Sequence, residues 1–213
     1  MKSYYAETGK RNIFQLWESK LSDGDSTTPS VSSQSYREQM VSMISAYIPL
    51  GNTNRILSIG CGNAFVEAEL VKKGLSVDAF DLHEEAVSYA LEKGVHARQV
   101  DLNTWEPEKE VYQLVYCDGI MGHLYRKDGL QSILNRLHVT LSVNGKIIIS
   151  NDPSTNNNNV QEHPSVPGFK WFSEEYIQSQ LLEAGFKNMK FIYIEYLRPL
   201  SGPRNRLIVA ATK

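Results

Sequence analysis

The chain has 213 residues, 41% hydrophobic and 10% aromatic, which is enough for one sizeable core, so we expect one globular domain with appendages. Its 22 basic and 24 acidic residues give a formal net charge of −2, without the basic excess of proteins that follow a phosphate backbone, so nucleic acid is an unfavourable partner. Two cysteines, Cys61 and Cys117, and five scattered histidines offer no disulfide framework and no metal-ligand cluster.

Membrane insertion and export are also not expected from the sequence. No apolar run approaches the roughly 18 residues that a membrane span needs, and the first residues lack the apolar segment of a signal peptide. We therefore expect a cytoplasmic chain with no membrane partner. The sequence leaves the oligomeric state open.

The first 35 residues are predicted to form an appendage, and residues 36–213 the main domain. A short helix is expected near the start, where apolar side chains recur at Ile13, Phe14, Leu16 and Trp17. Residues 22–35 are polar and rich in serine and threonine, which is typical of a loop, lid or linker. Met40, Ile44 and Ile48 then predict a helix that leads into the main domain.

The main domain alternates short strands with helices. Strands are expected over residues 56–59, 77–80, 97–100, 114–117 and 146–149, with helical patterns between most of them. This alternation predicts an α/β fold, a doubly wound and mostly parallel sheet with helices on both faces. Residues 191–196 and 206–212 have no helix between them, so the sheet should gain antiparallel pairing at the C-terminal end.

A glycine-containing loop, Gly60 to Ala64, follows the first strand and turns directly into a helix. Glycines let the backbone pass close to a ligand, and a helix N-terminus offers unpaired N–H groups. A tight strand-to-helix turn without any ligand is the alternative.

An acidic residue, Asp81, stands at the end of the second strand, nineteen residues after Gly62. A carboxylate at this spacing can accept both hydroxyls of a ribose. The alternative role for Asp81 is a helix cap for the segment that begins at His83, and the two roles are compatible.

The residues after the glycines narrow the choice of nucleoside ligand. Phe65 stands where a dinucleotide fingerprint needs a small residue, which disfavours nicotinamide and flavin dinucleotides. No lysine follows the glycines, which disfavours a phosphate-binding loop of the nucleotide triphosphatase type.

Five motifs then fall in one order along the chain: Ile56 to Ala64, Val77 to Leu82, Gln99 to Leu102, Gln113 to Gly119, and the Asn144-Gly145 turn. In this order and spacing the sequence resembles class I S-adenosylmethionine-dependent methyltransferases, from about residue 36 to residue 213. The resemblance implies a Rossmann-like sheet of seven strands in the order 3-2-1-4-5-7-6, with the last strand antiparallel. It also implies S-adenosylmethionine as the cofactor.

The resemblance further implies a set of cofactor-binding residues. The loop would face the amino-acid end of the cofactor, Asp81 the ribose, Leu82 and Leu102 the adenine ring, and Asp101 the adenine amine. Asp118 and Gly119 would lie beside the sulfonium, and Arg37 is a weaker candidate partner for the cofactor carboxylate. The full set is Arg37, Gly60, Cys61, Gly62, Asn63, Asp81, Leu82, Asp101, Leu102, Asp118 and Gly119.

Two positions depart from the family pattern. Ser58 replaces the acidic residue often seen in the first motif, and Ala64 replaces its usual last glycine. Ala64 is small enough to be tolerated, whereas Ser58 leaves an expected carboxylate absent.

Two residues beyond the fourth strand are candidates for catalysis. His123 can act as a general base that takes a proton from the acceptor, or it can be a hydrogen-bonded histidine that caps a loop. Tyr125 is a weaker candidate for the same role.

The acceptor class follows mainly from what the sequence lacks. Without a basic stripe or an appended docking domain, we expect a small-molecule acceptor methylated on O, N or C. The alternatives are a protein or RNA methyltransferase, and a non-catalytic domain that binds a nucleoside or a partner.

Overall fold

The computed structural model describes residues 12–21, 25, 27–48, 54–156, 158–164 and 166–213. Residues 1–11, 22–24 and 26 of the predicted appendage lie outside these ranges. The elements are α1 (Ile13–Glu18), α2 (Pro29–Ser32), α3 (Gln34–Tyr47), β1 (Arg55–Ile59), α4 (Phe65–Lys72), β2 (Ser76–Asp81), α5 (Glu84–Glu92), β3 (His96–Gln99), β4 (Tyr112–Asp118), α6 (Met121–Leu124), α7 (Gln131–Thr140), β5 (Leu141–Asn151), β6 (Val160–Glu162), β7 (Lys170–Phe172), α8 (Glu174–Glu183), β8 (Lys187–Arg198) and β9 (Gly202–Thr212).

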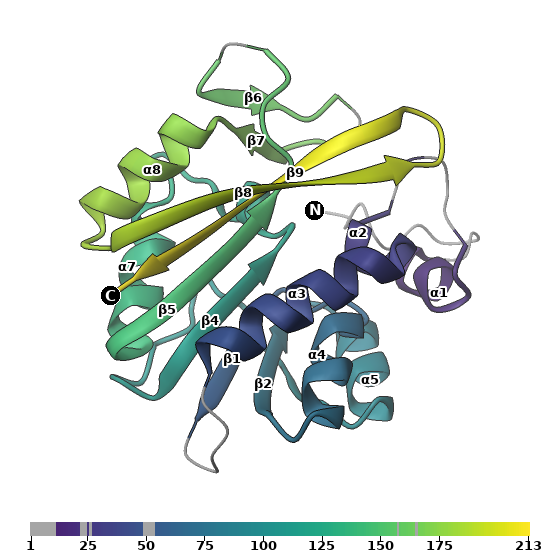
Figure 1. The fold of residues 1–213 in the computed structure, drawn as a ribbon, viewed down its shortest axis with the longest axis horizontal. Coiled ribbons are helices and arrows are strands. Elements are labelled where there is room, and N and C mark those ends of the chain that lie inside the picture. The colour runs from purple at the N-terminus through teal and green to yellow at the C-terminus, as the bar shows by residue number, and fades with distance from the viewer. Residues whose placement is uncertain (1–11, 22–24, 26, 49–53, 157, 165) are drawn as a thin grey trace.

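A seven-stranded sheet in the order β3-β2-β1-β4-β5-β9-β8 forms the centre of the molecule (Figure 1). The strands from β3 to β5 pair in parallel, and β9 runs antiparallel to both β5 and β8. This is the predicted order, with the last strand in sequence inserted between β5 and β8. The predicted Rossmann-like class is therefore confirmed.

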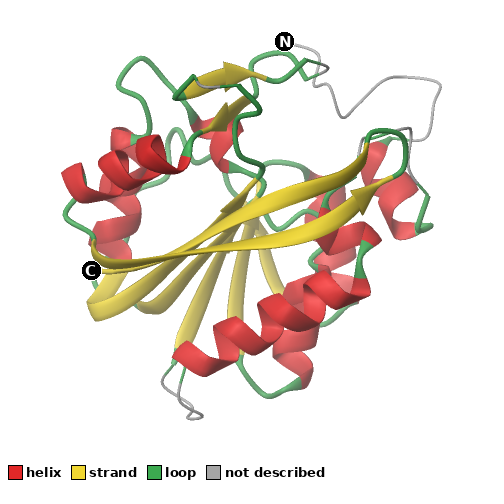
Figure 2. Cartoon of the chain, turned by 45° about the horizontal axis from the view of Figure 1, so that its top comes forward, coloured by secondary structure: helices red, strands yellow, loops and turns green. Residues whose placement is uncertain are grey.

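Helices cover both faces of this sheet, with α3, α4 and α5 on one side and α7 and α8 on the other (Figure 2). Successive residues of a strand point to opposite faces. Ile56 accordingly packs in the core beneath α3 and α4, while its neighbour Leu57 packs in the core beneath α7 and α8. Such strands are apolar on both sides, which explains their continuous runs of Ile, Leu and Val.

Part of the predicted loop over residues 22–35 is helical. α2 spans Pro29–Ser32, and α3 begins at Gln34 because the Ser33 side chain accepts the Tyr36 N–H at its N-terminus. Proline at the first helical position and serine at the N-cap are favourable residues there. The composition hid α2 because a helix of four residues is too short to show an apolar stripe.

Two other departures concern strands. A small hairpin of β6 and β7 precedes α8 and forms a separate two-stranded sheet, which the sequence did not predict. β5 begins at Leu141, upstream of the Asn144-Gly145 turn, and its pairing with β4 shifts register between Leu141 and Lys146. The turn residues thus occupy an irregularity within the strand.

Within the described part of the chain, no helix is long and apolar enough to cross a membrane. The same residues contain no group of three or more His, Cys, Asp or Glu side chains able to hold a metal ion.

Candidate active site

A cavity of about 630 Å³ lies at the carboxyl ends of β1, β2, β3 and β4. In open α/β sheets, ligands bind in the crevice at this edge, where the strand order reverses. α1 and α2 contribute lining from one side, and the segment before β7 contributes from another. The lining residues from these two sources are Phe14, Trp17, Thr28, Ser30, Val31, Val166 and Pro167.

The loop after β1 reverses direction tightly, with left-handed backbone at alternate positions. Gly60 has φ 66°, Gly62 has φ 51° and Ala64 has φ 55°. A Cβ atom on Gly60 would lie 2.6 Å from Cγ1 of Ile120, so only glycine fits there. Ala64 is small, as predicted, but a left-handed alanine costs about 1 kcal/mol that glycine would not incur.

Asp81 braces this loop against the end of β2. Its Oδ2 accepts the Gly62 N–H at 2.9 Å, and its Oδ1 accepts the His83 N–H at 2.9 Å. Burial raises the pKa of Asp81, and these backbone hydrogen bonds oppose the rise. α5 begins at Glu84, so Asp81 supports the turn before that helix and lines the cavity as well.

The predicted adenine end of the cavity is built from β2 and the segment after β3. Leu82 is 54% exposed although it is apolar, and it lines the cavity mouth together with Leu102. Asp101 accepts the Asn103 N–H at 2.9 Å, and this hydrogen bond lowers its pKa, so the carboxylate is charged at neutral pH.

At the end of β4, Asp118 and Gly119 line the cavity as predicted. One carboxylate oxygen of Asp118 accepts from Arg206 and from the Tyr36 hydroxyl, whereas the other is buried without a hydrogen-bond partner among the described residues. Gly119 has φ 70°, and a Cβ there would lie 3.0 Å from Nη2 of Arg206. The arginine thus sits directly behind this part of the wall.

The structure separates the two predicted catalytic residues. His123 lines the cavity, and burial lowers its pKa to about 4, so its imidazole is neutral at pH 7. Tyr125 is not a lining residue, and its ring packs 5.8 Å from Phe172 and 6.5 Å from Tyr176.

Three of the predicted cofactor-binding residues make hydrogen bonds within the protein. Arg37 lies outside the cavity, and its Nη1 donates to the carbonyls of Ser30 and Val31 at 3.0 Å each. The sequence expectation that Arg37 reaches the cofactor carboxylate is therefore not supported by its position, because the guanidinium fastens the α2 segment.

The other two lie on the cavity wall. Asn63 donates to the Phe14 carbonyl at 3.0 Å and to Glu18 at 2.7 Å, which attaches α1 to the glycine loop. Cys61 carries a free thiol whose pKa is raised well above its usual value, mainly by burial.

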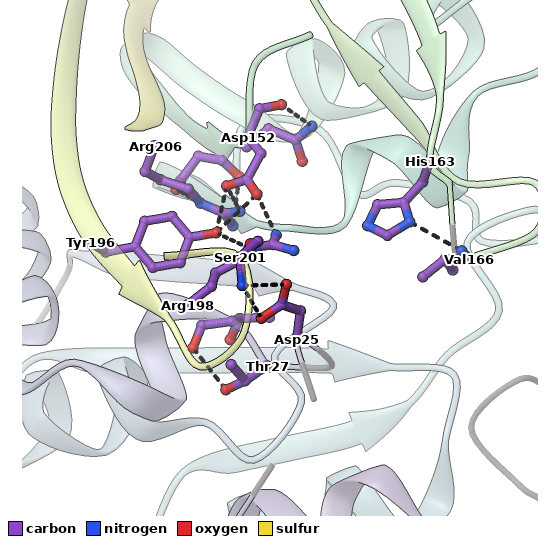
Figure 3. Close-up of polar contacts among 12 residues, drawn as sticks. Asp25, Thr27, Asp152, His163, Val166, Tyr196, Arg198, Ser201 and Arg206 are labelled. Atoms are coloured by element: carbon purple, nitrogen blue, oxygen red, sulfur yellow. Dashed lines mark hydrogen bonds and ion pairs between the residues drawn. The ribbon is translucent and has the colours of Figure 1, made fainter. Parts of the chain in front are cut away.

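A buried ionic network that the sequence did not reveal lies behind the wall. Figure 3 shows Tyr196, Arg198 and Arg206 converging on Asp152. Burial alone would raise the pKa of Asp152, but the two arginines outweigh it and lower the pKa. In the same view, the Asp25 carboxylate accepts the N–H of Ser201 at the β8–β9 turn, which fastens the N-terminal segment to that hairpin. The sequence signal is weak, because an arginine in an alternating strand normally faces solvent.

Glu67 is the other functional candidate that the sequence missed. It lies in the first turn of α4, lines the cavity, is 3% exposed and accepts the Ser58 hydroxyl at 2.6 Å. The absent carboxylate at position 58 was the available clue.

The sheet order, the left-handed loop after β1 and the acidic ends of β2 and β4 together define the fold class of the nucleoside-binding methyltransferases. Residues 6–169 match a family model described as "Putative S-adenosyl-L-methionine-dependent methyltransferase". The chain is also 34% identical over 220 residues to the tabtoxin biosynthesis enzyme of Pseudomonas amygdali pv. tabaci, covering 99% of this chain and 86% of that protein. The chain belongs to this methyltransferase family, and the predicted class is confirmed.

Solved structures share the fold at low sequence identity. Phosphoethanolamine N-methyltransferase 2 of Haemonchus contortus, in complex with S-adenosyl-L-methionine, matches with a TM-score of 0.72 and 16% identity, covering 100% of this chain and 58% of that one. The 1,6-didemethyltoxoflavin-N1-methyltransferase of Burkholderia thailandensis, with S-adenosylhomocysteine bound, matches with a TM-score of 0.65 and 21% identity, covering 85% of this chain and 80% of that one.

The cavity wall fits the cofactor of this family. Three lining residues carry a buried polar atom without a hydrogen-bond partner in the described part of the chain: Asn63 Oδ1, the Tyr116 hydroxyl and Asp118 Oδ2. Unpartnered buried polar atoms are rare in proteins because each costs free energy, so a ligand with complementary polar groups is their natural partner. S-adenosylmethionine is accordingly the cofactor of this methyltransferase.

Proposed function

We propose that this enzyme transfers a methyl group to an O, N or C atom of a small molecule by in-line displacement. The cavity carries this proposal, because it continues from Asp81 and Asp101 past the glycine loop to His123 and Pro167. Short local segments enclose it, which suits an acceptor of small size. The Pseudomonas relative is a tabtoxin biosynthesis enzyme, and the Burkholderia structure contains bound 1,6-didemethyltoxoflavin; both support an acceptor of this class.

We assign the cofactor contacts to the predicted residues that line the cavity. Asp81 accepts from the ribose hydroxyls, Asp101 from the adenine amine, and the two leucines 82 and 102 contact the ring. When bound, the cofactor supplies a methyl group activated by a sulfonium. The chain orients the reactants and keeps water out of the cavity, most of whose lining is apolar.

His123 is the proposed proton acceptor. Its neutral imidazole can accept a hydrogen bond from an O–H or N–H of the acceptor at pH 7, because its pKa is lowered to about 4. A nucleophile becomes more acidic as it gains a methyl group, so even a weak base can take its proton late in the reaction. Tyr125 is a positioning residue in this proposal, since it packs behind the β7 segment.

The N-terminal segment is proposed to act as a lid over residues 36–213. Trp17 lies above the loop, 3.5 Å from where a Cβ of Gly62 would stand, and Asn63 fastens α1 from below. Trp17→Ala is expected to weaken S-adenosylhomocysteine binding by about fivefold, because about 200 Å² of aromatic cover is lost. An unchanged dissociation constant in calorimetry would contradict the lid.

We also propose a cytoplasmic location, supported by two free thiols, one of them on the cavity wall. Detection of the chain in a periplasmic or secreted fraction would refute it.

Two measurements test the proposed function. Calorimetry with S-adenosylmethionine and S-adenosylhomocysteine should show binding to the purified protein. Incubation with pooled small metabolites should then give products heavier by one methyl group in mass spectrometry. Cofactor binding without any methylated product would favour a nucleoside-binding partner domain, and labelling of protein or RNA alone would favour the macromolecular alternatives.

A further inference from the structure

A carboxylate stands next to the serine that departs from the family pattern. Ser58 Oγ donates to Glu67 Oε1 at 2.6 Å, and both side chains are buried. Ser58 lies in β1 and Glu67 in α4, nine residues later, so the contact spans the glycine loop. The negative charge that the first motif lacks at position 58 is therefore present at nearly the same place, supplied by the helix.

This carboxylate is costly to the ligand-free protein. Its pKa is raised to about 7, chiefly by burial, although the Ser58 hydrogen bond acts in the opposite direction, and Asp118 and Asp81 add repulsion. Buried carboxylates are normally paired with a cation or several donors. The Ser58 hydroxyl and the backbone N–H of Glu67 itself do not offset the burial of this carboxylate, which indicates that a ligand completes the arrangement.

Two unpartnered atoms lie in the same wall. The Tyr116 hydroxyl and Asp118 Oδ2 are buried without hydrogen-bond partners among the residues described, and both residues line the cavity with Glu67. The pKa of Tyr116 is raised well above its usual value by burial first, and then by Asp118, Tyr36 and Glu67. The three groups line one cavity and influence one another electrostatically, so they form an electronegative, acceptor-rich corner.

An ammonium group suits this corner, because it carries one positive charge and three donors and no acceptor. The cofactor of this enzyme has one ammonium group, at its amino-acid end. We propose that Glu67 binds this ammonium group, together with Asp118 Oδ2 and the Tyr116 hydroxyl. The inference rests on the methyltransferase function and places the ammonium-binding carboxylate on a residue outside the first motif.

The charged and titratable groups around Glu67 come from three strands, the loop after β1 and α3. They are Asp81 on β2, Tyr116 and Asp118 on β4, Cys61 in the loop, Tyr36 on α3, and Arg206 on β9 behind Asp118. Arg206 is already paired with Asp118 and Asp152. Burial raises the pKa of Glu67 to about 7.

The test compares ligands that differ only at the amino-acid end. Calorimetry at pH 8 measures S-adenosylhomocysteine and 5′-methylthioadenosine, which lacks the ammonium and carboxylate groups, on wild type, Glu67→Gln and Glu69→Gln. Glu69 is the matched control, because it lies on the same helix but is half exposed and pairs with Lys72. Glu67→Gln should weaken S-adenosylhomocysteine at least tenfold and leave 5′-methylthioadenosine within threefold, and Glu69→Gln should change neither.

Proton linkage gives a second readout that a structural role would not produce. Binding of the ammonium group stabilises the charged form of Glu67, so wild type should release a fraction of a proton at pH 7. The heat of binding in phosphate and Tris buffers should then differ for S-adenosylhomocysteine but not for 5′-methylthioadenosine. Glu67→Gln should abolish this difference.

A relocation variant completes the test. Ser58→Asp combined with Glu67→Ser should recover most of the affinity lost in Glu67→Gln. Equal weakening of both ligands, or unchanged binding of S-adenosylhomocysteine, would overturn the assignment of Glu67. Failure of wild type to bind either ligand would instead refute the proposed function itself.

Discussion

Glu67 should destabilise the ligand-free protein above neutral pH, and Glu67→Gln should remove this effect. The pKa is about 7 in the folded protein against an ordinary 4.5, so the folded state binds more protons than the unfolded state between these values. Stability therefore falls as pH rises through this range. Each unit of pKa difference corresponds to about 1.4 kcal/mol, so the ionised carboxylate costs about 3 kcal/mol at pH 8.

Urea unfolding of the ligand-free proteins from pH 5 to pH 8.5 measures this cost. Glu67→Gln should exceed wild type by only about 0.8 kcal/mol near pH 5 and by about 3 kcal/mol at pH 8. Its amide can still accept the Ser58 hydroxyl, so the neutral contact persists. Glu69→Gln removes a surface pair with Lys72 and should change stability by less than about 0.5 kcal/mol, without this pH dependence. A Glu67→Gln variant that is no more stable than wild type at pH 8 would refute the reasoning.

Three further variants probe the remainder of the site. Arg206→Met should lose about 3–5 kcal/mol in urea unfolding at pH 7, because Asp118 and Asp152 would remain buried beside each other without their shared cation; a loss below about 1 kcal/mol would contradict this. Asp81→Ala should weaken S-adenosylhomocysteine binding at least tenfold in calorimetry through the lost ribose and Gly62 contacts, and undiminished affinity would remove the ribose assignment. With an acceptor from the mass screen, His123→Ala should lower kcat and leave cofactor affinity within threefold. The pH–rate profile of wild type should show no limb near pH 6.5 from His123, because the pKa of His123 is lowered to about 4. A limb at that pH that disappears in the variant would show that His123 is less buried than the structure has it.

The fold could be predicted because its strands are short apolar runs at regular spacing. Ile56 and Leu57 both had to be apolar, since the two faces of a parallel sheet are covered. Asp81 and Asp118 could be placed for the same reason, because each directly follows a buried run and the carboxyl ends of parallel strands meet at one edge. Both line the cavity.

The side-chain roles that could not be predicted from the sequence depend on contacts between distant segments. Arg37 has the right charge for a carboxylate, but the three-dimensional course of α2 brings two carbonyls within its reach. Tyr125 is close to His123 in sequence, yet the aromatic residues of β7 and α8 draw its ring behind the cavity wall. Glu67 occupies a helix position where glutamate normally faces solvent, and only its contact with Ser58 identifies it.

Cofactor binding should offset the loss of folding stability that the ionised Glu67 carboxylate causes. A ligand at a concentration of one hundred times its dissociation constant stabilises the folded state by about 2.7 kcal/mol, which is close to the cost of the ionised carboxylate at pH 8. If the ammonium group binds Glu67, saturation with the cofactor restores the free energy of unfolding that the protein loses through burial of the ionised carboxylate. The thermal shift produced by S-adenosylhomocysteine should therefore be larger at pH 8 than at pH 6 in wild type, and equal at the two pH values in Glu67→Gln. This ties the stability of the ligand-free enzyme to the same carboxylate that selects its donor.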